Sequence, residues 1–213
     1  MKTTKHEIKK SLSVFLKQQG FKQKKNYYYK IYDETACVIA IDVPSEILYL
    51  TACVIPLYIP YRGYIEYTYG NRIQTLNISA IGDVNTWIDR TAVALTNMID
   101  PFFQEISFIG DFSNLKEVIP KWHNKKLLFC SEEQLLRWMV YKALRSKEYK
   151  NAELAIDQFL SVLDQVNIYG EQVRTSYKQE MKHLRELLNN RVYHEIQEEL
   201  NNNIMKNREM LFQ

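Results

Sequence analysis

The sequence predicts an α+β fold: an N-terminal helix, an antiparallel sheet of four or five strands, a covering helix and an all-helical C-terminal region. Three observations lead to this prediction. Runs rich in Tyr, Val, Ile and Thr fill residues 27–80, and their connections are too short for the crossover helices of a parallel sheet. After Asp83 the spacing of apolar residues changes from two to about 3.6. From Ser131 onward the pattern is helical.

The composition is that of an ordinary globular protein. The chain has 213 residues, of which 46% are hydrophobic and 25% charged, so it can bury a sizeable core. The 28 Lys and Arg against 25 Asp and Glu leave a formal net charge of +3, which argues neither for nor against a phosphate-bearing partner. No signal-peptide pattern is present, and no stretch reaches the roughly 20 apolar residues that span a bilayer. We therefore expect a cytoplasmic protein with no membrane partner.

The first predicted helix covers residues 2–19. Its apolar residues share one face, and they are Ile8, Leu12, Phe15 and Leu16. Gly20 stands where a helix-terminating glycine is expected. The short basic loop predicted next carries Lys22, Lys24 and Lys25.

The predicted strands follow this loop. Three β-rich runs occupy residues 27–32, 35–43 and 47–57, and a tight turn at residues 44–46 separates the last two. A further strand is predicted at residues 72–80. The segment between, residues 58–71, is rich in tyrosine, and we expect a bulged or edge strand there because Pro56 and Pro60 cannot donate to a ladder.

Helices are predicted for the remainder of the chain. Asp83 caps a helix that passes through Trp87 toward Pro101, and a connector at residues 110–129 carries Trp122 and His123. Ser131 begins a capping box. The helices that follow cover residues 132–144, 148–166, 171–188 and a last segment to about residue 207. This pattern divides the chain into a sheet domain, residues 1–110, and a helical region, residues 111–213.

Several short features of the first half follow one pattern: Leu16 ahead of residues 20–22, Tyr28 or Tyr29 ahead of a charged residue and a β-run, and a helix from near Trp87 that closes at residues 101–103. In these features the first half resembles the bacterial family of domains of unknown function numbered 4304. The resemblance implies a helix, an antiparallel sheet and a covering helix, with Asp42 as the usual polar residue after the second strand. It implies no activity.

Cys37 and Cys53 lie equally far from Ser45, so a turn centred there places them opposite each other on paired strands. Their Cβ atoms would then be roughly 4.5 to 5.5 Å apart, and a disulfide needs a separation nearer about 3.8 Å. Two interpretations stay open: a strained disulfide, or two reduced and buried thiols that behave as small apolar residues.

Familiar catalytic motifs are missing from the sequence. With only 6 glycines there is no nucleophile elbow, Walker loop or dinucleotide fingerprint. No histidine has a second ligand at metal-binding spacing. His123, beside Trp122 in the predicted connector, is the one candidate for a catalytic base, although no partner for it can be named.

Most of the 15 tyrosines fall between Tyr27 and Tyr69, interleaved with basic residues. Tyrosine suits a protein interface because it offers a large contact area with few rotatable bonds. Bases could also stack on such rings beside a basic loop. The plain alternative is that alternating tyrosines cover a half-buried sheet.

The last helices carry an apolar stripe with three- and four-residue spacing, which must be buried somewhere. Core packing is the commoner outcome, and a homodimer through these helices is the alternative. Residues 143–160 also resemble one tetratricopeptide-type helix pair, although a solenoid needs several repeats.

The tyrosine-rich segment and the missing catalytic motifs predict a non-catalytic protein-binding module, of the inhibitor or immunity type. Its predicted contacts are Tyr61, Arg62, Tyr64, Tyr67 and Tyr69. One alternative is a weak single-stranded nucleic-acid binder that uses Lys22, Lys24 and Lys25. Another is an enzyme with an unfamiliar pocket near His123. No cofactor is expected.

Overall fold

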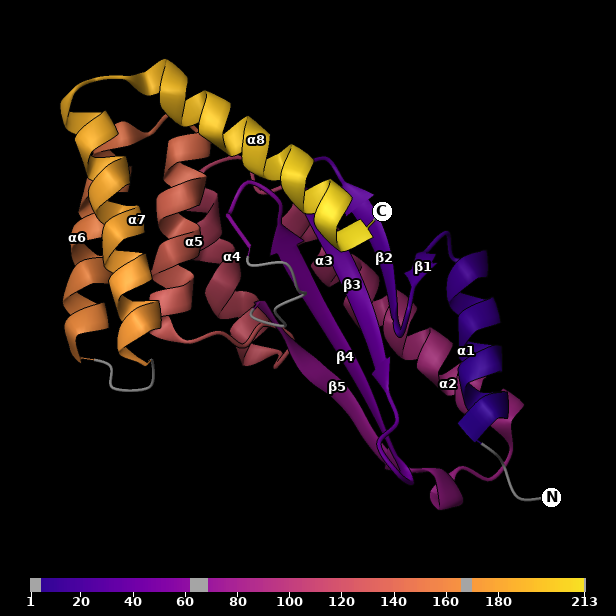
Figure 1. Cartoon of the computed structure of the whole chain (residues 1–213). Helices are drawn as coiled ribbons and strands as arrows, with labels where there is room; N and C mark the ends of the chain where they lie inside the picture. Colours follow the sequence, from indigo (N-terminus) through magenta and orange to yellow (C-terminus); the bar gives the residue numbers. More distant parts are fainter. Residues whose placement is uncertain (1–4, 62–68, 166–169, 213) are drawn as a thin grey trace. The chain divides into compact units, whose positions relative to one another are not determined.

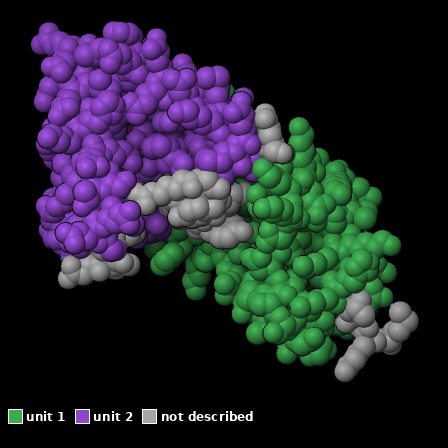
Figure 2. Space-filling view, in the orientation of Figure 1, with its two compact units in different colours: residues 1–55, 66–109, 118–129 green, residues 56–65, 110–117, 130–213 purple. Residues whose placement is uncertain are grey.

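The computed structural model describes residues 5–61, 69–165 and 170–212 (Figure 1). The α+β class is confirmed: an N-terminal helix is followed by a five-stranded antiparallel sheet and then by helices. The chain forms two compact units (Figure 2). The sheet unit comprises residues 1–55, 66–109 and 118–129, and the helical unit comprises residues 56–65, 110–117 and 130–213. The predicted domain boundary near residue 110 stays a prediction, because a compact unit need not fold by itself.

The strands of the sheet follow one another in space as they do in sequence. They are β1 (Lys22–Lys24), β2 (Tyr27–Tyr32), β3 (Thr35–Asp42), β4 (Ile47–Pro56) and β5 (Tyr69–Asn77). Strands β2, β3 and β4 lie where the sequence predicts them. The turn between β3 and β4 is also confirmed, since the amide of Ile47 donates to the carbonyl of Pro44 (3.2 Å).

The predicted basic loop is in part a strand. Gly20 ends the first helix with a φ of 83°, which turns the chain back on itself. Lys25 also has a positive φ (54°), and it lies in the two-residue turn that joins β1 to β2. Strand β1 contains only Lys and Gln, which have low strand propensity. Pairing with β2 therefore makes this segment a strand, and its own sequence does not predict one.

Strand β5 starts and ends earlier than the predicted strand, which ran from residue 72 to residue 80. Gly70 explains the earlier start, because a Cβ at this position would overlap the carbonyl oxygen of Ala52 on β4. Only glycine lets β5 approach β4 so closely. After Asn77 the chain turns into the 3-10 helix η1 (Ile78–Ala80), which ends the strand.

One long helical segment follows the sheet. It consists of α2 (Val84–Ala94), the π-helical turn η2 (Leu95–Ile99) and α3 (Asp100–Ser107). Asp83 caps it as predicted and accepts from the amide of Thr86 (2.7 Å). Pro101 has no amide hydrogen to give to the preceding turn, and the wider π turn directly before it accommodates the missing bond. The N-terminal helix α1 (Lys5–Gln18) matches its prediction within the described residues.

The predicted connector is wrong over most of its length, because residues 112–124 form helix α4 (Phe112–Asn124). Its buried residues recur with helical spacing, and they are Phe112, Leu115, Ile119 and Trp122. Pro120 removes one backbone hydrogen bond from this helix. Packing outweighs that loss: the indole of Trp122 is buried and donates to the carboxylate of Glu105 (2.8 Å).

Four helices make up most of the helical unit: α5 (Glu132–Arg145), α6 (Tyr149–Gln165), α7 (Glu171–Asn189) and α8 (Tyr193–Phe212). All four lie where the sequence predicts helices, and Ser131 and Gln134 form the predicted capping box. The apolar stripe of the last two helices is buried within the unit, at Met181, Leu184, Leu188, Ile196, Leu200 and Ile204. Core packing accounts for the stripe, and the homodimer stays a prediction.

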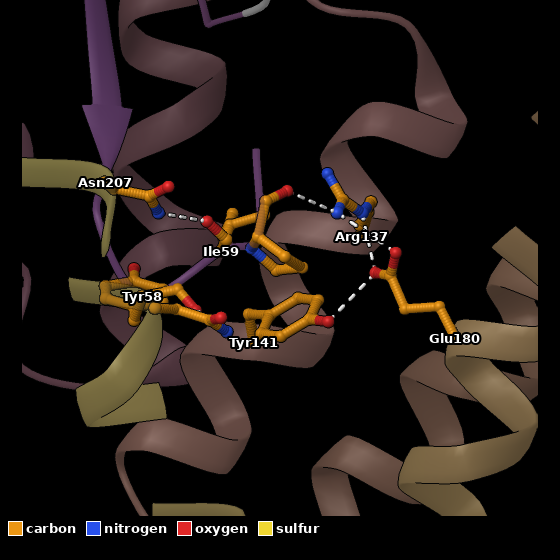
Figure 3. Close-up of polar contacts among 8 residues, drawn as sticks. Tyr58, Ile59, Arg137, Tyr141, Glu180 and Asn207 are labelled. Carbon is orange, nitrogen blue, oxygen red and sulfur yellow. Dashed lines mark hydrogen bonds and ion pairs between the residues drawn. The ribbon is translucent and has the colours of Figure 1, made fainter. Parts of the chain in front are cut away.

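In the helical unit, four successive backbone carbonyls are held by side chains of α5 and α8. They belong to residues 57–60, directly after β4. Asn207 donates to the first and third of these carbonyls (2.7 Å each), Asn203 to the second (3.2 Å) and Arg137 to the fourth (2.9 Å). Figure 3 shows the bond from Asn207 to Ile59. Asn207 is only 2% exposed. These bonds therefore satisfy acceptors that would otherwise be buried without a donor.

Arg137 also forms an ion pair whose two side chains are 9% and 19% exposed. Its guanidinium donates twice to the carboxylate of Glu180 on α7 (2.8 and 3.1 Å), and the hydroxyl of Tyr141 donates to the same carboxylate (2.9 Å) (Figure 3). A bidentate pair with a further hydrogen bond is the geometry that offsets the desolvation of two buried charges. We assign this network to the core of the helical unit.

Replacing Asn207 with leucine should lower the free energy of unfolding by about 2–4 kcal/mol, because two buried carbonyls lose their donor. The matched control is Asn202→Leu, an exposed position on the same helix, where the change should stay within about 0.5 kcal/mol. Urea unfolding followed by circular dichroism measures both. Equal effects of the two substitutions would show that the hydrogen bonds from Asn207 to the backbone after β4 do not stabilise the fold.

Gly70→Ala should lower the free energy of unfolding by about 2 kcal/mol or more, because the added methyl group overlaps the backbone of β4. Gly82→Ala is the control, since a Cβ there meets no atom within 4 Å. The same unfolding measurement applies. A Gly70→Ala protein as stable as Gly82→Ala would contradict the close approach of the two strands.

Candidate functional site

Of the five residues predicted to contact a partner, the structure describes only the first and the last, Tyr61 and Tyr69. Tyr69 is 2% exposed, so its ring belongs to the core of the sheet unit, and the prediction that it contacts a partner is corrected. Tyr61 is half-buried and belongs to the helical unit. The other predicted contacts, Arg62, Tyr64 and Tyr67, lie outside the described residues.

The three lysines predicted to contact nucleic acid do not share one surface. Lys22 and Lys24 lie in β1, and side chains alternate between the two faces of a strand. Gln23, between them, therefore points to the opposite face. Gln23 and Lys25 line a hollow beside α1, whereas Lys22 and Lys24 are not among the described residues that line it.

His123 lies in the last turn of α4 and not in a loop. Its side chain is exposed, and its ring stacks on that of Phe129 with centroids 6.2 Å apart and 19° between the planes. It is not among the described residues that line the cavity of this unit. The enzyme hypothesis that depends on His123 stays a prediction.

The three cysteines are free thiols. Burial raises the pKa of Cys37 to about 12 and that of Cys130 to about 11, and it raises the pKa of Cys53 well above its usual range. A thiol acts as a nucleophile or metal ligand only when it is ionised. At neutral pH these residues therefore behave as small apolar side chains. Across residues 5–61, 69–165 and 170–212, no group of three or more His, Cys, Asp or Glu could hold a metal ion.

The sheet unit contains a cavity of about 390 Å³. Strands β4 and β5, the segment from α2 to η2, and the turn after α4 contribute its lining. The described lining residues are Leu50, Asn71, Arg72, Ile73, Gln74, Arg90, Thr91, Ala94, Leu95, Met98, Ile99, Lys125, Lys126 and Leu127. A cavity of this volume with a mostly apolar lining suits a small organic molecule.

The helical wall of the cavity includes the π turn η2. Three of its residues, Leu95, Met98 and Ile99, belong to the lining. A π turn is rare and frequently lies at a functional site. Met98 lines the cavity and remains partly exposed, so the helical wall carries apolar surface that is in contact with solvent.

Two contacts hold the turn after α4 against β5. The amide of Phe129 donates to the carbonyl of Gly70 (3.1 Å), and the side-chain amide of Asn71 donates to the carbonyl of Lys126 (2.7 Å). Helix α4 ends in a Schellman motif in which Lys126 has a φ of 58°. This turn brings Lys125 and Lys126 to the cavity.

The cavity has a cationic lining. Arg90, Lys125 and Lys126 are exposed residues that line it, and none of the described lining residues is acidic. Arg72 is a fourth cation of the lining, but its guanidinium lies over the ring of Tyr49 (3.9 Å). Like charges gathered around an apolar hollow produce a positive potential that attracts anions.

Two buried polar atoms of the lining have no hydrogen-bond partner among the described residues. They are the hydroxyl oxygen of Thr91 and the carboxamide oxygen of Gln74. Thr91 is only 5% exposed. Leaving a buried polar group unpaired costs about 1–3 kcal/mol, and native proteins rarely do so. The hydroxyl of Thr91 can donate to a ligand oxygen, and Gln74 can accept from a ligand donor.

Sequence reasoning missed this cavity, because its residues come from segments far apart between Leu50 and Leu127 and form no motif. One local signal was present. Thr91 follows Trp87 by one helical turn, which places a hydroxyl on the buried face of α2. The adjacent pair Lys125 and Lys126 was a second signal. Because a connector was predicted there, the position of this pair at the end of a helix was not recognised.

Comparison of the chain with protein-family models, curated proteins and solved structures found no match. The resemblance of the first half to a family of unknown function stays a prediction. In the part of the chain that the structure describes, no helix has the length and apolar character to cross a bilayer.

The buried thiols predict a loss of stability at alkaline pH. The unfolded chain releases thiol protons near pH 9, whereas folded Cys37 keeps its proton up to about pH 12. The stabilisation that the protonated, buried thiol of Cys37 provides is therefore fully present below pH 9 and is lost as the pH rises toward 12. Each such thiol contributes up to about 1.4 kcal/mol per pH unit in this window.

Cys37→Ala should therefore flatten the dependence of the unfolding free energy on pH between 9 and 11, whatever its effect at pH 7. Urea unfolding at four pH values measures the slope for the wild type and the variant. An unchanged slope would show that Cys37 ionises as readily in the folded chain as in the unfolded chain.

Proposed function

We propose that this protein is a non-catalytic binding protein whose sheet unit binds a small amphipathic anion in the cavity between β5, α2 and the turn after α4. The observation that carries the proposal is the unpaired, buried hydroxyl of Thr91 in the wall of a cationic cavity. Folded proteins rarely leave a buried hydroxyl without a hydrogen-bond partner, and a bound ligand would supply the missing partner here.

The charges of the lining support an anionic ligand. Arg90, Lys125 and Lys126 meet at the cavity without an acidic neighbour among the described lining residues. A carboxylate or a phosphate would pair with these side chains, and Arg90 could bind either in a bidentate manner. Ligands with such a group share the chemistry, whether they are carboxylic acids or phosphate esters.

The apolar part of the lining supports a ligand with a hydrocarbon portion. Leu50, Leu95, Ile99 and Leu127 supply aliphatic surface. A polar anion without an apolar portion would leave this surface in contact with water. The oxygen of Gln74 can accept a hydrogen bond from a ligand that carries a donor, such as the hydroxyl group of a hydroxy acid.

Binding describes this cavity better than catalysis does. Carboxylate, imidazole and thiol groups provide most general acid–base and nucleophilic catalysis. None of the described lining residues carries one of them. The protein-partner hypothesis has only Tyr61 among its described, incompletely buried contacts, so the cavity is the better supported site.

The test compares three ligands of one chain length by isothermal titration calorimetry: octyl phosphate, 3-hydroxyoctanoate and 1-octanol. The two anions should bind with one site per chain. 1-Octanol should bind at least about tenfold more weakly, because it lacks the charge that Arg90, Lys125 and Lys126 attract.

Thr91→Val is the decisive variant, because valine keeps the shape of threonine and removes its hydroxyl. It should weaken binding of the anions about fivefold to tenfold while leaving the free energy of unfolding unchanged or higher. Thr75→Val, at an exposed position on β5 outside the described lining, is the control and should change neither quantity. Equal binding of 1-octanol and the anions, or a Thr91→Val protein that binds normally, would refute the proposal.

A further inference from the structure

The positive charge of this chain is concentrated at its N-terminus. The first 30 residues contain nine lysines and one glutamate, whereas the whole chain has nearly equal numbers of cationic and acidic residues. Much of this segment forms α1 and the β1–β2 hairpin of the sheet unit (Figure 1). A basic cluster within one element pair is the electrostatic pattern of a polyanion-binding surface.

A groove of about 430 Å³ lies between α1 and this hairpin. One wall is a single face of α1, because its residues are spaced by three and four: His6, Lys9, Lys10 and Ser13. The tip of the hairpin forms the other wall with Gln23, Lys25 and Asn26. The floor is Tyr28 and Ile41, both buried in the sheet.

Hydrogen bonds fix the hairpin wall. The side-chain amide of Gln23 donates to the carbonyl of Lys25 (3.2 Å), and the hydroxyl of Ser13 donates to the carboxamide oxygen of Gln23 (3.4 Å). Asn26 donates to the carboxylate of Asp42 (2.6 Å), so the acidic group nearest the tip is bound to an amide. The positive φ of Lys25 holds this residue at the turn beside α1.

Three lysines thus line one groove, and none of its described lining residues is acidic. Like charges held close together repel each other, and a bound polyanion removes that repulsion. The cations occupy both walls of an open channel, which suits a linear chain of phosphates better than a single ion. The basic residues of α1 face a hollow that the hairpin tip closes on its other side, whereas a recognition helix lies in the groove of a duplex.

We infer that this groove binds the phosphate backbone of a single-stranded nucleic acid, with Lys9, Lys10 and Lys25 as the phosphate contacts. This site is separate from the proposed anion cavity, since the two share no described lining residue. Lys22 and Lys24, which the sequence grouped with Lys25, are not part of it.

The experiment measures fluorescence anisotropy of a labelled 12-nucleotide oligouridylate at several salt concentrations. Each phosphate contact on a single strand contributes about 0.7 to the slope of log K against log salt. The variant Lys9→Gln/Lys10→Gln/Lys25→Gln should therefore reduce that slope by about 2 and weaken binding at low salt at least about tenfold.

The control, Lys17→Gln/Lys22→Gln/Lys150→Gln, loses the same net charge at exposed positions outside the groove and should keep both values close to those of the wild type. If the groove variant unfolds at a lower temperature, the single change Lys10→Gln repeats the test with an expected slope change of about 0.7. Equal losses in the control, equal affinity for a duplex of the same length, or equal affinity for inorganic polyphosphate of the same charge would overturn the inference.

Discussion

The candidate site of the sheet unit depends on one short pairing, in which residues 126–129 lie against residues 70–71 of β5. The carbonyl of Gly70 accepts from the amide of Phe129, and Asn71 donates to the carbonyl of Lys126. Glycine at position 70 is required, because any side chain would overlap β4. Without this pairing the lysines after α4 would have no fixed place beside the strand, and the cavity would lose one wall.

The polar network of the helical unit and the cavity of the sheet unit differ in how completely their buried polar atoms are paired. In the helical unit, the side-chain NH2 group of Asn207 donates to two carbonyls, and Glu180 accepts from both Arg137 and Tyr141. Such satisfaction is what a stable core requires. In the sheet unit, Thr91 and Gln74 leave buried oxygen atoms without a described partner at the cavity. That difference is the physical reason for assigning a structural role to the first network and a binding role to the second.

Local chemistry made much of the fold predictable. Gly20, Asp83 and Ser131 mark helix ends through backbone geometry and side-chain capping, which a sequence displays directly. Strand β1 and helix α4 were not predictable in this way: β1 is a strand because β2 pairs with it, and α4 continues past Pro120 because its apolar face is buried. The cavity was even less predictable from the sequence, because tertiary packing decides whether a buried hydroxyl finds a hydrogen-bond partner.

A methyl NMR titration of the protein with 3-hydroxyoctanoate tests most directly whether a ligand binds in the cavity of the sheet unit. If the cavity is the binding site, the methyl signals of Thr91, Leu127 and Met98 will shift together and saturate at one ligand per chain, while those of Leu200 and Ile204 in the helical unit will stay in place. Shifts that spread over both units, or signals of Thr91 and Leu127 that do not move while others do, would contradict the assignment of the cavity as the binding site.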